Sequence, residues 1–180
     1  MLNKAPDTRF LDWKVNNTLH HLEKLKKRLP WQQFKSTKRM VCSLGSDYGY
    51  SGHVTKGNSF DLYPPLKELM DKLNAELDTN FNSVLINYYP KGEYVGINAH
   101  QDDEQELIKG QPVVSVSLGA SCIFELKDVY KGKPNEHIKV ELKDGDIFVM
   151  GNDCQQFYYH SIGYTKMEFD RISITFREFQ

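Results

Sequence analysis

The pattern of apolar and polar positions divides the chain into a front part with two helices and a β-rich remainder. Leucines recur at helical spacing before Pro30, and they are Leu19, Leu22, Leu25 and Leu29. A second apolar stripe at helical spacing begins at two prolines and runs from residue 64 to about residue 77. We therefore predict two amphipathic helices in this part of the chain.

After residue 80, short β-rich runs follow one another, separated by turn signals such as Lys91-Gly92 and Asp144-Gly145. The predicted strands span residues 83–89, 113–118, 122–126, 138–142, 147–150 and 171–176. Successive short strands without helices between them favour a sandwich, barrel or jelly roll over a parallel α/β sheet. We predict one domain over residues 1–180, mainly β with N-terminal helices (α+β), in which residues 1–80 precede a β core at 81–180.

Composition narrows the class of protein. The chain has 180 residues, 39% hydrophobic and 26% charged, which suits a compact domain and excludes disordered, collagen-like and coiled-coil chains. No apolar run approaches the ~18–20 residues that cross a bilayer, and the first residues lack the apolar stretch of a signal peptide. The scattered cysteines Cys42, Cys122 and Cys154 predict reduced thiols. We expect a monomeric intracellular protein, cytoplasmic or nuclear, without a membrane partner.

The charge is distributed unevenly, although the net charge is only −1. Residues 1–60 contain 11 Lys and Arg against 4 Asp and Glu, whereas residues 61–180 contain 12 against 20. A basic front part beside an acidic body could meet phosphates. On charge alone, however, a solvated helix face is the favoured explanation.

Candidate chemistry begins at His100-Gln101-Asp102. In a strand, residues i and i+2 project to one side, so this tripeptide can present an imidazole and a carboxylate to one point. The C-terminal β region offers His160 as a third ligand. Two histidines and one carboxylate form the facial triad of non-heme Fe(II) oxygenases. On its own, the His-x-Asp motif is weak evidence for a metal site, because an isolated histidine is more often a packed or surface residue.

Two further strands offer groups that bind anions. Residues 171–177 alternate, which places Arg171, Ser173 and Arg177 on one face, and guanidinium groups bind carboxylates bidentately. The alternative is a strand with a wet face. Asn87 and Tyr89 share a strand face before a turn and offer an amide and a phenol as hydrogen-bond donors. If these two residues stood alone, an Asn beside a turn and a half-buried Tyr would be the preferred explanation.

In chain order, these residues resemble the AlkB-like 2-oxoglutarate and Fe(II)-dependent dioxygenases, which remove alkyl groups from nucleobases. The matching motifs are Asn87-x-Tyr89, His100-x-Asp102, His160 and Arg171-x5-Arg177. The resemblance implies a double-stranded β-helix of the jelly-roll type. It also implies Fe(II) bound by His100, Asp102 and His160, with 2-oxoglutarate and O2 as co-substrates. The residues implied to hold 2-oxoglutarate are Arg171, Tyr89 and Ser173 at its far carboxylate, and Arg177 and Asn87 at the carboxylate beside the metal.

The activity implied by the resemblance is oxidative demethylation of N-alkylated bases of the 1-methyladenine and 3-methylcytosine type. Its substrate residues would be Arg39, Tyr48, Tyr50, Asp103 and Glu104. In this interpretation the two tyrosines stack on the base and the two acids contact its exocyclic amine, whereas the alternatives are β packing and a solvated turn. The target base must be flipped out or already single-stranded to reach the metal.

Only seven residues separate Trp31 from Arg39, too few for the long intercalating hairpin of relatives that repair duplexes. We therefore expect single-stranded DNA or RNA as the partner. Candidate phosphate contacts are Lys24, Lys26, Lys27, Arg28, Lys35, Lys38 and Arg39. Two alternatives stay open: an oxygenase that acts on a protein or small molecule, and a catalytically inactive nucleic-acid-binding module. The segment of Tyr48 and Tyr50 speaks against the first and the intact ligand set against the second.

Overall fold

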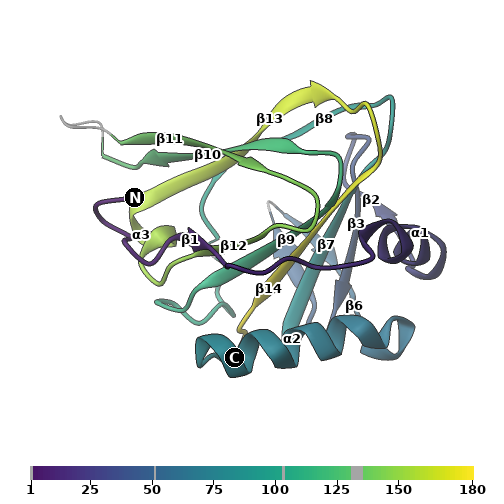
Figure 1. The fold of residues 1–180 in the computed structure, drawn as a ribbon, viewed down its shortest axis with the longest axis horizontal. Helices are drawn as coiled ribbons and strands as arrows, with labels where there is room; N and C mark the ends of the chain where they lie inside the picture. The colour runs from purple at the N-terminus through teal and green to yellow at the C-terminus, as the bar shows by residue number, and fades with distance from the viewer. Residues whose placement is uncertain (1, 51, 103, 131–135) are drawn as a thin grey trace.

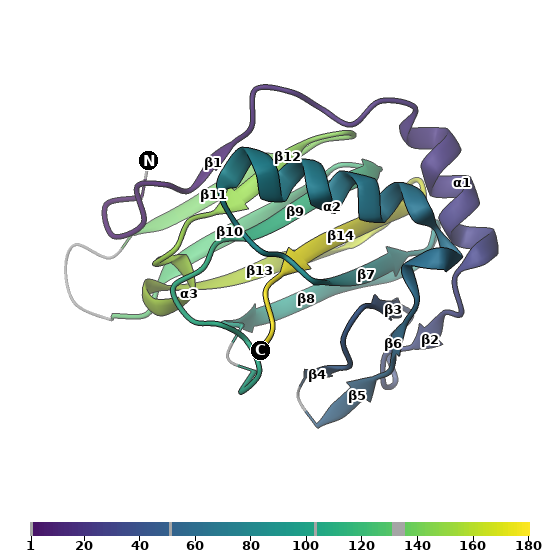
Figure 2. The same ribbon diagram turned by 90° about the horizontal axis from the view of Figure 1, so that it is seen from below.

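The protein is described here from a computed structural model, which covers residues 2–50, 52–102, 104–130 and 136–180. Two β-sheets lie face to face, and α2 (Pro64–Leu77) crosses the outer face of the larger sheet, while α1 (Thr18–Arg28) packs near its end (Figures 1 and 2). The chain is thus mostly β with few helices, as its sequence predicts. Among the described helices, none has both the length and the apolar character needed to span a bilayer.

The larger sheet has eight strands, in the order β1-β12-β9-β14-β7-β3-β2 with β6 paired to β3. Its strands are β1 (Arg9–Phe10), β2 (Gln32–Gln33), β3 (Met40–Leu44), β6 (Gly57–Asn58), β7 (Ser83–Tyr89), β9 (Val113–Gly119), β12 (Ile147–Met150) and β14 (Arg171–Arg177). The smaller sheet, in the order β11-β10-β13-β8, consists of β8 (Tyr94–His100), β10 (Cys122–Asp128), β11 (His137–Leu142) and β13 (Tyr158–Lys166). The remaining elements are the hairpin of β4 (Tyr48–Tyr50) and β5 (His53–Thr55), the 3-10 turn η1 (Phe60–Leu62) and the short helix α3 (Cys154–Phe157).

Both predicted helices are present, and their apolar stripes face the larger sheet. In α1, Leu22 and Leu25 are buried, but Leu19 is 73% exposed, so the predicted stripe is wrong at its first position. In α2, two prolines occupy the first turn, where a missing N–H costs no hydrogen bond, and the buried residues recur at helical spacing. Those residues are Leu66, Met70 and Leu73.

All six predicted strands are present, within two residues of the predicted ends. The pattern missed β8 and β13, and the short strands that residues 1–80 contribute beside the two helices. In β13 the pairing with β8 shifts register twice between His160 and Thr165, which interrupts strict alternation of apolar and polar residues. The three cysteines are buried and free.

The central strands of the larger sheet are buried on both faces, and this decides the environment of the site. One core lies between its outer face and the helices, and a second lies between the two sheets. Consequently all seven residues of β14 are buried, and the alternative of a wet face for this strand is wrong. The functional side chains of β14 and β7 project into the space between the sheets.

Candidate functional site

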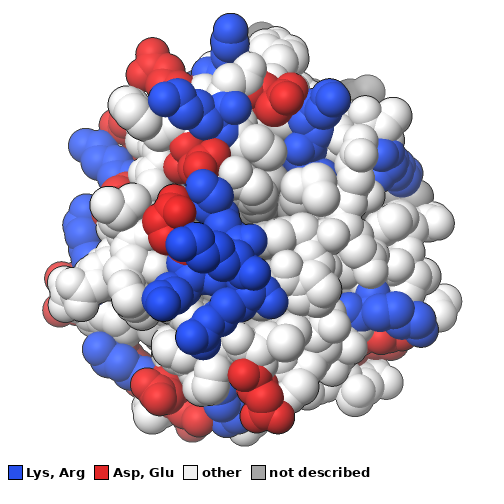
Figure 3. All heavy atoms as spheres, turned by 90° about the vertical axis from the view of Figure 1, so that its right-hand side faces the viewer, with Lys and Arg blue, Asp and Glu red and all other residues white. Residues whose placement is uncertain are grey.

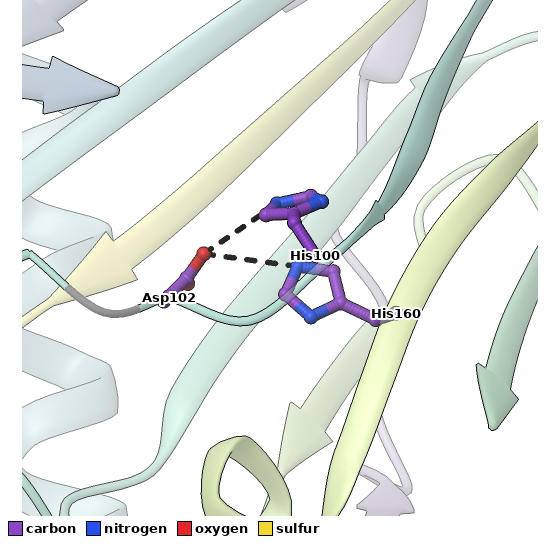
Figure 4. A group of neighbouring side chains, drawn as sticks. All are labelled: His100, Asp102 and His160. Atoms are coloured by element: carbon purple, nitrogen blue, oxygen red, sulfur yellow. Dashed lines mark ion pairs between the residues drawn. The ribbon is translucent and has the colours of Figure 1, made fainter. Parts of the chain in front are cut away.

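The three predicted metal ligands converge between the sheets. His100 ends β8 and lies directly opposite His160 of the antiparallel strand β13, so their ring centroids are 4.1 Å apart. Asp102 lies two residues beyond the end of β8, and its carboxylate faces both rings (Figure 4). The expectation that His100 and Asp102 share a strand is therefore wrong, because the chain leaves the sheet at His100. The three side chains therefore meet because of the path of the loop after β8, as well as the pairing of β8 with β13.

The donor atoms fit a metal ion. Asp102 Oδ1 lies 3.6 Å from His100 Nε2 and 3.7 Å from His160 Nε2. Neighbouring ligands around a metal with bonds of about 2 Å are about 3 Å apart, so small side-chain movements would close the site. Asp102 Oδ1 is buried and makes no hydrogen bond with any described residue. The other oxygen, Oδ2, accepts hydrogen bonds from Arg177 at 2.8–2.9 Å, so Oδ1 is left for the metal.

The protonation states of these groups also suit metal binding. Burial lowers the pKa of His160 to about 3 and the pKa of His100 below its ordinary value, so both imidazoles are neutral at neutral pH. His100 Nδ1 lies 2.8 Å from the Asn98 carbonyl oxygen, a contact that directs the proton to Nδ1 and the lone pair to Nε2. Burial favours the neutral acid at Asp102, but the Arg177 guanidinium holds the pKa of its carboxyl below the ordinary value.

Two glutamines attach the loop of Asp102 to α3. The Gln155 side-chain oxygen accepts a hydrogen bond from the Asp102 backbone N–H at 2.9 Å. In return, the Gln101 side-chain amide donates to the Gln155 carbonyl oxygen at 2.5 Å. This reciprocal pair positions the carboxylate, since Asp102 itself lies outside the sheet. Sequence reasoning did not find Gln155, because no local spacing connects it with Asp102.

A second polar site surrounds Arg171, at the other end of β14 from Arg177. The Arg171 side chain is fully buried, and its one hydrogen bond to a described residue goes to Ser117 Oγ at 3.2 Å. Its Nε and Nη1 have no partner among the described residues, and its guanidinium carbon lies 4.9 Å from the Tyr89 ring centroid. The Tyr89 hydroxyl is also fully buried on this side of the pocket, and burial raises the pKa of this phenol, which remains a donor. These donors fit a carboxylate.

The other residues expected at 2-oxoglutarate lie between these two sites. Asn87 and Ser173 are directly opposite each other on β7 and β14, and both line the pocket between the sheets. The Ser173 hydroxyl lies 3.3 Å from Ser115 Oγ. Asn87 Oδ1 accepts a hydrogen bond from Arg39 Nη1 at 2.5 Å. Asn87 therefore connects the strand that lines the pocket with an arginine at the pocket wall.

The expected substrate residues lie in different places. Arg39 is 5% exposed, lines the pocket, and its guanidinium carbon lies 4.1 Å from the Phe34 ring centroid. Tyr48 is only 4% exposed and packs within 5.0 Å of the Arg177 guanidinium, so it forms part of the pocket wall. Glu104 is buried, and burial together with the Asp102 carboxylate raises its pKa. Asp103 and the side chain of Tyr50 lie outside the described part of the chain.

The structure adds two pocket residues that the sequence did not indicate. Phe34, just before the β2–β3 turn, and His53 of β5 both line the pocket, with ring centroids 5.4 Å apart in an edge-to-face arrangement. His53 Nε2 is buried and has no hydrogen-bond partner among the described residues. Neither residue belongs to a spaced motif, so only the folding of these short strands over the pocket shows their position. Apolar residues of the smaller sheet complete the lining, among them Ile97, Phe124, Leu142 and Ile162.

Known proteins share this sequence pattern. The profile described as the 2OG-Fe(II) oxygenase superfamily matches residues 10–177. The protein named DNA oxidative demethylase ALKBH2 from Bos taurus is 30% identical over 154 residues, which are 82% of this chain and 54% of that protein. Alpha-ketoglutarate-dependent dioxygenase alkB homolog 3 from Homo sapiens is 27% identical over 173 residues, 87% of this chain and 59% of that protein. The RNA replication protein of Grapevine virus A (isolate Is 151) is 36% identical over 131 residues, 73% of this chain and 7% of that protein.

The chain thus spans somewhat more than half the length of the two cellular relatives and a small part of the viral one. Among solved structures, that of OsALKBH1 matches with a TM-score of 0.62 and 18% sequence identity. The match covers 96% of this chain and 98% of the other, which shows that the two share a fold.

Proposed function

This chain belongs to the 2OG-Fe(II) oxygenase superfamily, and we propose that it oxidatively demethylates N-alkylated bases in single-stranded DNA or RNA. The proposal rests on one observation above all: the ligand atoms of His100, Asp102 and His160 all lie within 4.8 Å of one another, and the two histidines line the pocket between the sheets. Among the relatives, some are named for DNA demethylation and one for RNA replication. Both kinds of nucleic acid are therefore candidate substrates.

The interleaved order of the strands supports a double-stranded β-helix as the scaffold. Strands β12, β9, β14 and β7 lie in one sheet, and β11, β10, β13 and β8 lie in the other, so consecutive strands alternate between sheets over much of the core. In this arrangement residues that are far apart in sequence meet between the two sheets. The two histidines come from the smaller sheet, Asp102 comes from the loop after β8, and the two arginines come from the larger sheet.

His100, Asp102 and His160 would hold Fe(II), and the Arg171 guanidinium with the Tyr89 phenol would bind the far carboxylate of 2-oxoglutarate. When bound, iron and 2-oxoglutarate reduce O2, so that one oxygen atom enters succinate, with loss of CO2, and the other enters the N-methyl group, which leaves as formaldehyde. The chain itself contributes position and charge. Arg177 holds Asp102 Oδ2 and keeps the carboxylate ionised, while the apolar lining excludes water from the reacting groups.

The base would enter the pocket beside Phe34 and His53, the aromatic residues that the short strands bring to its wall. The β2–β3 connection supports a single-stranded substrate. Gln32 and Gln33 already pair with Val41 and Met40, so this hairpin is a short turn with no long projecting arm. An unpaired base can reach the metal without the cost of opening a duplex.

The test compares 1-methyladenine and 3-methylcytosine in ribo- and deoxyribo-oligomers, in the presence of Fe(II), ascorbate and 2-oxoglutarate. Formaldehyde release together with the repaired base supports the proposal. Turnover of 2-oxoglutarate without repair would favour a protein or small-molecule substrate, and oligonucleotide binding without any turnover would favour an inactive binding module.

His160→Ala should abolish turnover while the far-ultraviolet circular dichroism stays that of a folded β protein, because the substitution removes one of three metal ligands. The matched control is His137→Ala, since His137 lies on β11 and pairs with Glu125 on the exposed side of the smaller sheet. Full activity of His160→Ala would contradict the assigned metal site.

A further inference from the structure

Among the basic residues of residues 1–60, two groups of four differ in their partners. Four lysines form ion pairs with carboxylates at 2.5–2.6 Å: Lys4 with Asp128, Lys14 with Asp146, Lys26 with Asp170 and Lys56 with Asp47. Lys26 was an expected phosphate contact, but Asp170 already neutralises it. A second group forms no ion pair with any described residue, and consists of Lys24, Lys27, Arg28 and Lys38.

Three members of the second group share one face of α1. Lys24, Lys27 and Arg28 stand at positions i, i+3 and i+4, which are neighbours on a helix surface, and all three are exposed. The opposite side of α1 is buried through Leu22 and Leu25. Figure 3 shows a cluster of Lys and Arg side chains on the side of the molecule where α1 lies.

Like charges at this spacing repel one another, so the cluster has an energetic cost in the free protein. The helix C-terminus offsets part of this cost, because the negative end of the helix dipole lies near the last turn. That compensation does not extend to Lys24, which stands before the last turn, or to Lys38, which is outside the helix. The charge therefore suits an anionic partner better than it suits the stability of α1.

The chain then leads from this face to the pocket. After α1, Gln32 and Gln33 form β2, and the turn that follows contains Lys35 and Lys38. The residues that flank this turn, Phe34 and Arg39, line the pocket itself. Exposed Lys and Arg side chains thus occur throughout the segment that connects the end of α1 with the residues of the pocket wall.

We propose that Lys24, Lys27 and Arg28, continued by Lys38, form a phosphate-binding track for the strand whose target base occupies the pocket. The inference rests on the proposed function, and it names the surface that the substrate backbone follows. Phosphates bound there would be outside the pocket, so the track would raise affinity for oligonucleotides over single nucleosides without selecting sequence. A single-stranded oligonucleotide is favoured over an anionic membrane because the cations lead to the pocket.

The experiment measures the affinity of the full chain for a single-stranded, fluorescently labelled oligonucleotide at several salt concentrations. The test variant replaces Lys24, Lys27 and Arg28 by Gln. The matched control replaces Lys109, Lys127 and Lys166 by Gln, which removes the same charge from exposed positions before β9, on β10 and at the end of β13, where these lysines also form no ion pair with any described residue. Circular dichroism and thermal unfolding show that both variants are folded.

Each phosphate contact on a single strand contributes about 0.7 to the slope of log affinity against log salt, so three contacts contribute about 2. The affinity of the unaltered chain should therefore fall about 20-fold more than that of the test variant when salt rises from 50 to 200 mM. The control variant should keep the full slope and the full demethylation rate.

A slope for the test variant equal to that of the unaltered chain would overturn the proposal, as would an equal loss in the control. A third arm measures retention on phosphatidylserine vesicles. If the test variant lost binding to vesicles but kept its salt slope on the oligonucleotide, the surface would belong to a lipid partner. The salt slope does not depend on turnover, whereas failure of the proposed function appears as absence of demethylation by the unaltered chain.

Discussion

The two arginines of β14 should respond to the same substitution with opposite changes in stability. Arg171 is fully buried without a carboxylate partner among the described residues, whereas Arg177 forms an ion pair with Asp102 at 2.8 Å. Methionine approximates the length of arginine and removes the charge. Arg171→Met therefore removes an uncompensated buried cation, and Arg177→Met leaves Asp102 as an uncompensated buried anion.

The magnitudes follow from these contacts. A buried ion carries an effective desolvation penalty of several kcal/mol, which the Ser117 hydrogen bond and the Tyr89 ring offset only in part, so Arg171→Met should raise the free energy of unfolding of the metal-free protein. Breaking a buried ion pair costs about 3–5 kcal/mol, so Arg177→Met should lower it by that amount. Arg171→Met would also remove the two charge-assisted hydrogen bonds that we propose between Arg171 and 2-oxoglutarate, each worth about 1.5–3 kcal/mol. The KM for 2-oxoglutarate should rise about 10²- to 10⁴-fold.

Urea unfolding without metal and co-substrate measures the stabilities, and the rate of succinate formation against 2-oxoglutarate concentration measures KM. Arg9→Met serves as the control, because Arg9 is exposed on β1 and its guanidinium contacts a backbone carbonyl. Two results would refute the reasoning: a loss of stability in Arg171→Met as large as that in Arg177→Met, or an unchanged KM for 2-oxoglutarate in Arg171→Met.

Two further predictions concern the metal ligands. His160 stays neutral in the fold down to a pKa of about 3 but takes up a proton near pH 6.5 when unfolded, so the metal-free protein should lose up to about 1.4 kcal/mol of stability per pH unit as pH falls through this window. Urea unfolding at pH 6 and pH 5 measures this loss of stability, and the free energy of unfolding of His160→Gln should depend less steeply on pH. An equal pH dependence in both proteins would contradict the low pKa of His160 in the fold. Gln155→Ala should weaken metal affinity about 10- to 100-fold, because the Asp102 backbone N–H loses its hydrogen-bond acceptor. Metal titration measures this affinity, and Gln156→Ala, at the exposed neighbouring position, is the control.

The sequence was sufficient to predict the helices, six strands and the three candidate metal ligands that the fold brings together. Local periodicity determines which residues share a face of one strand, so Arg171, Ser173 and Arg177 could be grouped from spacing alone. The same reasoning placed Asp102 in a strand with His100, which the structure does not show. A strand ends where its pairing with a neighbour ends. The pairing of β8 with β13 ends at His100 and His160, so Asp102 lies outside the strand.

Partners across the sheets could not be predicted in this way. Lys26 was expected to contact phosphate, but the fold brings it to Asp170, which is 144 residues away in the chain. Tyr48 was expected to stack on a base, and the structure places it in the pocket wall against Arg177. Phe34 and His53 line the pocket, although no motif in the sequence indicated either residue.

By itself, the sequence determined which chemical groups this protein has and their order along the chain, since spacing within a helix or strand follows from backbone geometry. Only the tertiary structure decided which charges are neutralised, and it shows that Arg177 forms an ion pair with Asp102 whereas Arg171 has no carboxylate partner among the described residues. The physical reason is that electrostatic and hydrogen-bond energies depend on distance and burial between segments, and both are set by the register of the sheets and the packing between them.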